Sequence, residues 1–511
     1  MDQRARHKRK YNFYQKLLDG LLLAAGALFP SPAFPRKKNY KSGGFYPGTG
    51  DSAAAAPGAK WRLGFASDTL LTGNELDGNH FVGGVIARGR KTATEVYDDM
   101  RVRAAAVSAG GGGTAVFAAL DLYGLTNRDV RIIRSRLADY AVQKGIVSIN
   151  LMSLHQHSVV DTFGMNGELK QAFLVNPLKN LVRRKDIKSG KNPAFMENLF
   201  RVTANTIKAA CENMEPGELF FGAADAAAYV VDHRPPFVND TALNRLRFRP
   251  DNPASRETWL VTWCAHCGGN GPGNRQITSD YPYYMEKAVR EESGANLLLI
   301  LGAIQSNAMN KDSALLGLPA EHTAVDTMDA YGRALARLLA GIGPGSEEAV
   351  EPILSIRHRE VFLPLSNRLM IFVFKTGLFT NAVVRTKLFG YALASEIGWA
   401  RLGRNIAVAL IPGELEPSLA YGGTLGAGES WSGKAWDLPS LKDMAGENQK
   451  LLVFGLANDQ IGYIVADNDF VPMMAPETVH VEMVSIDRHC ASTLMTAFEQ
   501  IARPAQAVQK E

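Results

Sequence analysis

Two histidines, His155 and His157, form the pattern in this sequence with the clearest potential for chemistry. They follow an apolar segment, 145–149, which we expect to be a short buried strand, and they occupy alternate positions where that strand should end. Alternate residues of an extended chain point to the same side, so both imidazoles can face one pocket. Neutral imidazole is a common zinc ligand, and a second imidazole beside it can move protons or hold an oxyanion. The spacing leaves both uses open.

Other polar residues follow apolar segments that we expect to be strands. The segments are 259–263, 295–304, 406–411 and 450–456, and the polar residues that follow them are Cys264-Ala265-His266-Cys267, Gln305-Ser306-Asn307, Pro412-Gly413-Glu414 and Ala457-Asn458-Asp459. Ligand sites of α/β sheets usually lie at the carboxyl ends of strands. We therefore expect a site where these strands end.

The elements that must position these residues alternate along the chain. We expect strands at 101–107, 114–120, 145–151 and 369–374, and helices at 127–144, 197–212, 281–292 and 324–339. The first helix has Val130, Ile133, Leu137 and Tyr140 at near-helical spacing. Strands that alternate with helices predict an α/β fold.

Composition and charge restrict the class of protein. The chain has 511 residues, of which 46% are hydrophobic and 21% charged, as in ordinary globular proteins. The first 42 residues carry ten Lys and Arg against two Asp, a local charge of +8, and since the whole chain carries +5, the remainder carries −3. The basic excess belongs to the N-terminus, and no nucleic-acid-binding motif accompanies it, so we expect no nucleic-acid partner.

The N-terminal segment has three interpretations. Residues 1–16 are basic and residues 17–29 are mostly apolar, which is the order found in a signal peptide. The apolar run is interrupted by Asp19 and is short for a membrane-spanning helix. A helix packed on the protein body and an interfacial anchor at a membrane surface are the other two interpretations. The sequence does not decide between membrane-associated, cytoplasmic and secreted locations. We predict a segment with linker at 1–59, a catalytic domain at 60–475 and a C-terminal extension at 476–511.

Cys264 and Cys267 suggest a redox pair or half of a zinc knuckle when they are considered alone. Cys211 and Cys490 stand singly, so no second pair completes a four-cysteine zinc site. We expect two small semi-buried thiols on either side of His266.

A series of segments between 60 and 470 carries a resemblance to a known family. In chain order the segments are Gly64 to Thr69, Tyr97 to Ala104, Ala119 to Leu125, His155-Gln156-His157-Ser158, Ala265-His266-Cys267, Thr278-Ser279-Asp280-Tyr281-Pro282, Ile411-Pro412-Gly413-Glu414 and Gly455 to Tyr463. Together they resemble the N-terminal catalytic domain of the neutral/alkaline ceramidases, which are zinc-dependent amide hydrolases.

The resemblance implies a site and a reaction. It implies a ceramidase-like α/β domain with a mixed sheet and without the family's C-terminal immunoglobulin-like domain. It also implies a Zn²⁺ ion held by His155, His266, Glu414 and Tyr463. Zinc in such a site lowers the pKa of a water molecule and polarises the carbonyl that is attacked. The resemblance makes His157 a proton shuttle or oxyanion donor, gives Tyr463 a catalytic role as well, and assigns Arg234 to substrate contact. A ceramide-like N-acyl lipid is the implied substrate.

One segment departs from the family pattern. The family has a catalytic serine in a Ser-Pro pair after a Gln-x-Asn motif, and here the aligned position falls near Lys311 or Asp312, with Ser313 next to them. This departure keeps two alternatives to a ceramidase open. One is a zinc hydrolase of another ester or amide, and the other is a non-catalytic lipid-binding protein with the same fold.

Three further features near these motifs have alternatives. Asp121 and Asp280 can orient the histidines or form turns. Glu416 is expected to face solvent or to contact the residues around the ligands. Residues 421–432, with Trp431, are expected to form a loop that covers a lipid-like group or a plain surface loop.

Overall fold

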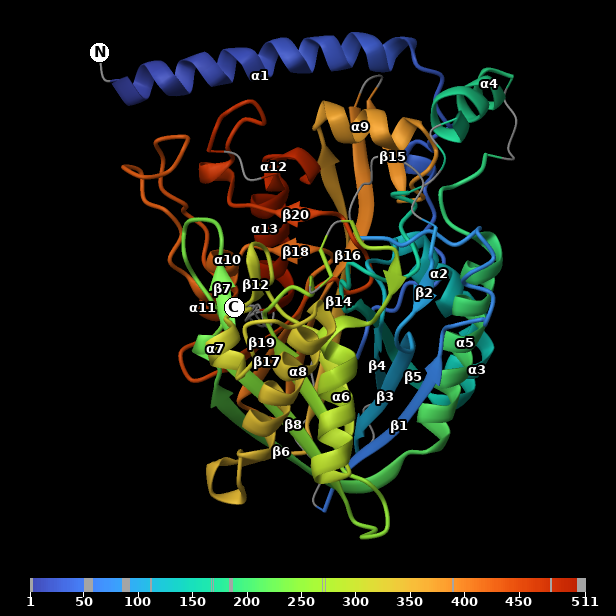
Figure 1. Cartoon of the computed structure of the whole chain (residues 1–511), viewed down its shortest axis with the longest axis vertical. Coiled ribbons are helices and arrows are strands. Elements are labelled where there is room, and N and C mark those ends of the chain that lie inside the picture. The colour runs from blue at the N-terminus through green and yellow to red at the C-terminus, as the bar shows by residue number, and fades with distance from the viewer. Residues whose placement is uncertain are drawn as a thin grey trace, which may run out of the picture.

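Two β-sheets packed face to face form the centre of the molecule, a computed structural model (Figure 1). The structure describes residues 3–49, 58–84, 92–110, 113–166, 168, 170–182, 187–268, 270–271, 273–387, 390–477 and 480–502. The alanine-rich part of the predicted linker, residues 50–57, and the last nine residues of the predicted extension, 503–511, therefore lie outside the described residues.

The first sheet has nine strands in the order β11-β9-β8-β6-β1-β3-β4-β5, with β13 paired to β6. The strands are β1 Trp61–Thr69, β3 Arg101–Ala109, β4 Thr114–Leu120, β5 Ile146–Ser153, β6 Glu215–Asp225, β8 Ala242–Pro250, β9 Thr258–Trp263, β11 Asn296–Leu301 and β13 Glu348–Val350. The pairs β4·β5 and β9·β11 are parallel and the other pairs are antiparallel, so the sheet is mixed.

The second sheet has five strands, with β15 paired to β16 and the others in the order β14-β16-β17-β19. They are β14 Leu354–Leu365, β15 Val383–Lys387, β16 Gly390–Leu402, β17 Ile406–Leu410 and β19 Lys450–Phe454. Three two-stranded ladders join segments that follow the main strands: β2 Glu95–Val96 with β10 Gln276–Ile277, β7 Val230–Asp232 with β12 Asn307–Met309, and β18 Glu414–Leu415 with β20 Tyr463–Ile464.

Alternating residues of the strands explain why the sheets stack. In β3 and β4, Ala104 and Val116 pack with the helices on one face, whereas Ala105 and Phe117 belong to the core shared with the second sheet. Phe117 meets Phe454 of β19 across that core, with ring centroids 5.6 Å apart. Alternate residues of a strand point to opposite faces, so each strand contributes to both cores. The small alanines on both faces allow the helices and the second sheet to approach closely.

Helices cover the outer faces of this pair of sheets. Along one side lie α2 Asn127–Arg136, α3 Ala138–Lys144 and α5 Pro193–Glu212 (Figure 1). The helices α6 Asp280–Ser293 and α8 Ala324–Ala340 pack on each other near β8, β9 and β11. The helix α13 Cys490–Ala502 covers the second sheet. The predicted helix at 127–144 is divided at Leu137 into α2 and α3, and α2 begins at a capping box formed by Thr126 and Asp129. The remaining helices are α1 Gln3–Leu28, α4 Asn176–Leu181, α7 Ser313–Leu316, α9 Arg368–Lys375, α10 Pro417–Tyr421, α11 Leu441–Ala445 and α12 Val481–Val484, with a π-helix, η2, at Gln171–Val175 and short 3₁₀ turns at Lys37–Asn39, Ala227–Tyr229, Pro344–Ser346 and Asp467–Asp469.

The predicted strand at 369–374 is wrong, because this segment is the helix α9. The Asn367 side chain caps the helix by accepting from the backbone N–H groups of Leu369 and Met370, at 3.0 and 3.3 Å. Met370, Ile371 and Phe374 are buried, which is one face of a helix. A short apolar run has the same composition in a buried strand and in a buried helix, so only the cap distinguished them.

The N-terminal helix α1 lies across one end of the molecule, beside α9 and the loops before α12 (Figure 1). Its Gly26 carbonyl accepts a 2.6 Å hydrogen bond from Lys375 Nζ, and Gln15 Oε1 accepts from the N–H of Met473 at 2.9 Å. The chain then packs on the second sheet, where Phe34 meets Tyr391 and Tyr40 meets Phe362. Within the described ranges, none of the helices combines the length and hydropathy that a membrane span requires.

Candidate active site

The predicted site residues come together where strands of both sheets end. His155 and His157 follow β5, and His266 lies three residues beyond the end of β9. Glu414 begins β18, after β17, and the parallel ladder of β18 and β20 places Tyr463 directly opposite Glu414. The expectation that polar residues at strand ends form one site is therefore met for these side chains.

The three imidazoles form a cluster that can hold a metal ion. The nearest ring nitrogens of His155, His157 and His266 all lie within 4.8 Å of one another. Glu414 joins them, because its Oε2 atom is 2.9 Å from His266 Nε2 and 3.3 Å from His155 Nε2. His155 is fully buried and Glu414 is nearly so.

Backbone carbonyl groups fix two of these rings. Nδ1 of His155 is 2.8 Å from the Tyr123 carbonyl oxygen, and Nδ1 of His266 is 2.9 Å from that of Asn307. Each Nδ1–H donates, so in the neutral ring Nε2 is left with its lone pair directed at the common point. This arrangement is typical of imidazoles that bind metals. His155 also has a φ of 53°, an uncommon left-handed conformation outside glycine, at the point where the chain turns into the site.

The carboxylate and the imidazoles of the cluster affect one another's protonation. Burial acts to raise the pKa of Glu414, but His155 and His266 outweigh burial and lower the pKa below its ordinary value. Burial acts to lower the pKa of His266, but the Glu414 carboxylate raises it. His266 Nε2 and Glu414 Oε2 lie 2.9 Å apart, so a cation bound between them would replace any proton in this contact. Imidazole and carboxylate donors are the ligands that zinc prefers, so the residues present fit the ion that the fold family implies.

His157 has a different environment from the other two histidines. Burial lowers its pKa well below the ordinary value, and the neighbouring His155 and His266 lower it further. Among the residues that the structure describes, Nε2 of His157 has no hydrogen-bond partner. A half-buried imidazole with a lowered pKa and an unpartnered ring nitrogen is suited to accept a proton, or to be a further ligand.

Tyr463 lies opposite Glu414 in the ladder of β18 and β20. Burial raises the pKa of its hydroxyl well above the ordinary value, and the nearby Glu414 carboxylate adds to this. The hydroxyl is 3.4 Å from Nε2 of His480, a histidine outside the motifs found in the sequence. His480 follows no strand and belongs to no recognised motif, so no signal in the sequence pointed to it.

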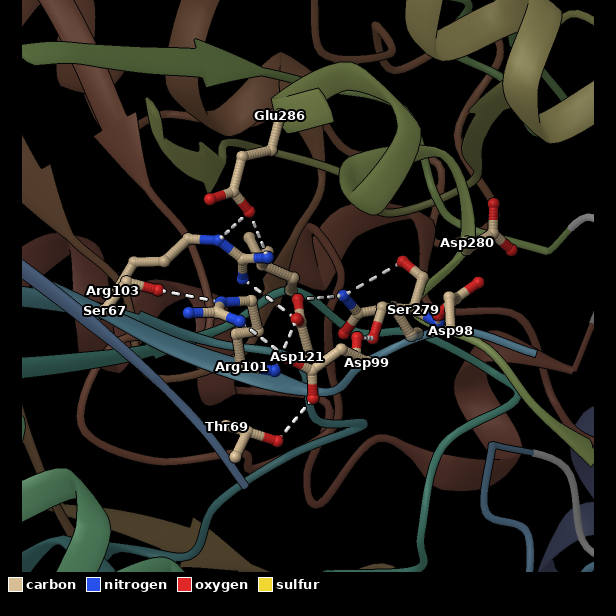
Figure 2. Close-up of polar contacts among 12 residues, drawn as sticks. Ser67, Thr69, Asp98, Asp99, Arg101, Arg103, Asp121, Ser279, Asp280 and Glu286 are labelled. Atoms are coloured by element: carbon tan, nitrogen blue, oxygen red, sulfur yellow. Dashed lines mark hydrogen bonds and ion pairs between the residues drawn. The ribbon is translucent and has the colours of Figure 1, made fainter. Parts of the chain in front are cut away.

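A polar network around Asp121 holds the segment that carries His155 and His157, and Figure 2 shows Arg101, Arg103, Asp121 and Glu286 of this network. The Gln156 amide, between the two histidines, donates to Asp121 at 2.7 Å. Asp121 also accepts from the Arg101 N–H at 2.8 Å and from Arg103 Nη1 at 2.9 Å, and Arg103 pairs with Glu286 of α6 at 2.6 Å. Asp121 therefore orients the histidine segment through Gln156 rather than through an imidazole.

Asp280 has a local role at the start of α6. It has a φ of 60°, and its carboxylate accepts from the Tyr281 N–H at 2.7 Å. Beside it, Asp98 accepts from Thr278 Oγ1 at 2.5 Å and from the Ser279 N–H at 2.6 Å. Thr278 in turn donates its N–H to the Ser158 carbonyl, so this turn also supports the segment after His157.

Arg234 lies in a buried ion network next to the cluster. Its guanidinium is 2.9 Å from Glu482, 3.2 Å from Asp469 and 3.5 Å from Glu416. Glu416 is therefore buried against Arg234, which excludes the solvent-facing alternative and leaves the alternative of contacts around the cluster. Arg234 also lines a cavity of about 430 Å³ together with Trp431 and residues of α1.

The segment that departs from the family pattern is held by structural contacts. The Asn307 carbonyl fixes His266, Lys311 Nζ donates to the Gly268 carbonyl at 2.5 Å, and Asp312 caps α7 by accepting from the Leu315 N–H at 2.9 Å. Both Lys311 and Asp312 are exposed, and Ser313 is half-buried. Cys264 and Cys267 are buried free thiols whose Sγ atoms donate to the carbonyl oxygens of Asp240 and Leu154.

The architecture of this chain is found in proteins of known structure. No protein-family model matches the sequence, and no curated protein matches it. Among solved structures, the neutral ceramidase from Pseudomonas aeruginosa aligns with a TM-score of 0.62 over 87% of this chain and 74% of that chain, at 12% identity. The chain has the neutral ceramidase fold. A ceramidase complexed with C2 aligns equally well, with a TM-score of 0.63 over 87% of this chain and 75% of that chain, at 14% identity.

The ceramidase resemblance inferred from short motifs is thus confirmed as a resemblance of fold. The mixed-sheet α/β class is confirmed with it. Sequence identities this low show common architecture, and the chemistry must be argued from the side chains of the cluster.

Proposed function

We propose that this protein is a zinc-dependent hydrolase of the neutral ceramidase type, which cleaves the N-acyl amide bond of a ceramide-like lipid. The observation that carries the proposal is the convergence of His155, His157, His266 and Glu414 in a ceramidase fold, with Nδ1 of two rings fixed by backbone carbonyls. This cluster supports the proposal because its donor atoms already face one another, with the ring nitrogens within 4.8 Å.

His155, His266, Glu414 and Tyr463 would hold the zinc ion. When bound, zinc polarises the scissile carbonyl and lowers the pKa of a water molecule to about 7. Glu414 supplies the negative charge, because the lowered pKa of its carboxyl keeps it ionised. Tyr463, beside Glu414 in the ladder, would be the more weakly held ligand, which a substrate can displace.

His157 would handle protons during the reaction. Its neutral, unpartnered Nε2 can accept the proton of the attacking water and then deliver it to the leaving amine nitrogen, as acyl transfer from an amide requires. His480 Nε2 lies 3.4 Å from the Tyr463 hydroxyl, so this pair is proposed as a second place where a proton can be held. Arg234 is proposed as a substrate contact through the cavity that it lines with Trp431.

A hydrolase of another acyl ester or amide is the second candidate. It is supported by Lys311 and Asp312, which stand near the place of the family's catalytic serine and are both engaged in structural contacts. A metal site with this proton acceptor attacks esters and amides alike, so the substrate depends on the residues around the cluster.

Hydrolysis of a fluorescent N-acylsphingosine, with and without a chelator, tests the proposal. We expect turnover that the chelator removes and added zinc restores. A parallel panel of acyl amides and acyl esters separates the two candidates, because turnover confined to other substrates supports the second. No turnover of any acyl substrate by the zinc-loaded protein would contradict both and leave a binding protein with this fold.

A further inference from the structure

The N-terminal helix α1 has two different long faces. The face toward the body makes polar contacts, such as the ion pair of His7 with Glu477 at 2.7 Å and the bond between Trp431 Nε1 and Asn12 Oδ1 at 3.2 Å. The opposite face is an apolar stripe at helical spacing, formed by Phe13, Leu17, Leu21, Ala24 and Leu28. Leu17 is 57% exposed, Leu21 63% and Leu28 87%. A lone exposed leucine is ordinary, but a continuous stripe on one helix face marks an interaction surface.

A second exposed apolar group continues this stripe beyond the end of α1. In η2 and α4, Leu174, Leu178 and Leu181 are 52%, 56% and 68% exposed. The Phe29 ring lies 6.4 Å from that of Phe173, and Asn180 Nδ2 donates to the Pro30 carbonyl at 3.2 Å, so the two groups adjoin. We call the outward stripe of α1 and the exposed residues of η2 and α4 the docking face. Figure 1 shows α1 and α4 at the same end of the molecule.

Basic residues surround the docking face. Arg6 and Lys10 continue the stripe toward the N-terminus on the same side of α1, and both are exposed, as is Lys16. At the same end, Arg36, Lys37, Lys38, Arg385 and Lys387 line a cavity of about 720 Å³ without an acidic side chain. The first 42 residues carry a charge of +8 in a chain whose remainder carries −3, so positive charge is concentrated here.

We infer that the docking face binds an anionic lipid surface, with α1 lying in the plane of the interface. An exposed apolar stripe with basic residues beside it is the pattern of helices that lie on membranes. A second copy of the chain would bring like charges together, whereas an anionic bilayer complements them. The stripe is too short and too polar at its N-terminal half to span a bilayer. This inference goes beyond the proposed function and does not depend on it.

Sedimentation with lipid vesicles tests the inference without any substrate. The full chain is mixed with vesicles of phosphatidylcholine alone, or of phosphatidylcholine with phosphatidylglycerol. We expect binding to the anionic vesicles that weakens with added salt, and little binding to the neutral ones. Leu17→Glu with Leu21→Glu should lower the apparent vesicle affinity by at least about tenfold, because the charges must leave water.

A matched control carries the same change elsewhere. Val142 of α3 is 85% exposed and lies away from α1, so Val142→Glu should bind vesicles as the wild type does. Unchanged thermal unfolding of the Leu17/Leu21 variant shows that it remains folded. The inference is overturned if the wild type binds neither vesicle, if the Leu17/Leu21 variant binds as well as the wild type, or if Val142→Glu loses binding equally. A wild-type dimer that dissociates in the Leu17/Leu21 variant, without vesicle binding, would assign the face to a second copy.

Discussion

His155 and His266 are each oriented from two sides, by a hydrogen bond from Nδ1 to a backbone carbonyl and by Glu414 at Nε2. The carbonyl groups are those of Tyr123 and Asn307, which belong to other segments of the chain than the histidines. The chemistry at the residue scale therefore rests on how the surrounding turns are held, and Gln156 is the residue that ties the histidine segment to the Asp121 network.

Replacing Gln156 with Ala tests this dependence. The change removes the bond to Asp121 but leaves the ligands themselves, so we expect faster zinc loss and a lower kcat rather than complete inactivity. The free energy of unfolding should fall by about 1–3 kcal/mol, because a buried hydrogen bond is lost. Zinc release to a chromogenic chelator and urea unfolding measure the two effects. Gln276→Ala, in a partly exposed polar contact, is the control and should change neither. Equal zinc release from Gln156→Ala and wild type would contradict the positioning role.

At the scale of elements, the helix α9 is held by its cap and by a tie to the neighbouring segment. Asn367 accepts from two N–H groups of α9, while its Nδ2 donates to the carbonyl oxygens of Met483 and Ser485 at 3.0 and 2.7 Å. One side chain thus fixes both the start of α9 and the end of α12. These two helices stand beside α1 and the chain that leads from Tyr463 to His480.

Asn367→Ala should therefore lower the free energy of unfolding by about 2 kcal/mol, which is the upper part of the range for a lost cap. Chemical denaturation followed by circular dichroism gives this value. Asn252→Ala, at an exposed turn, should change stability by less than about 0.5 kcal/mol. A loss of the same small size for both variants would show that the cap does not hold this region.

Sequence patterns predicted most elements of the core and the convergence of the strand ends. The apolar strands and amphipathic helices were found because period-two and period-3.6 patterns report burial directly, as in β4 and α8. The segment 369–374 could not be assigned in this way, since its identity depends on the Asn367 cap. The ligands His155, His266 and Glu414 were named from motif resemblance, and the structure brings them together.

The rest of the site depends on contacts between distant segments. Nothing near His480 in the sequence indicates that it meets Tyr463, and the burial of Glu416 follows from Arg234, 182 positions earlier. The pairing of Gln156 with Asp121 is likewise set by the fold. Such contacts arise from tertiary packing and leave no periodic trace in the sequence.

At the scale of the whole molecule, buried polar residues join the two halves. Arg134 of α2 pairs with Glu396 of β16 at 2.7 Å, and Arg131 pairs with the same carboxylate at 2.8 Å. Ser148 of β5 contacts Nε2 of His358 in β14 at 2.8 Å, across the boundary between the two sheets. The two sheets therefore share a polar connection in addition to the apolar core around Phe117 and Phe454.

This connection makes stability depend on pH. Burial lowers the pKa of His358 to about 4, and Arg134 adds to this although Glu396 opposes it. The unfolded chain binds the proton near pH 6.5, so the contribution is fully present above that pH and is lost as pH falls toward 4. We expect a loss of up to about 3 kcal/mol across this window from His358. His358→Gln, which keeps a group that can bond to Ser148, should flatten the pH dependence measured by urea unfolding. An unchanged slope in that variant would assign the pH dependence to other groups.

The most direct test of the central claim is the zinc content of the purified protein, measured by elemental analysis together with N-acyl amide hydrolysis. We predict about one zinc per chain in the wild type and in His322→Ala, which changes a histidine outside the cluster. His155→Ala should lose both zinc and turnover, whereas His157→Ala should keep zinc and lose turnover. Full zinc occupancy in His155→Ala, or no zinc in the wild type after reconstitution, would contradict the account.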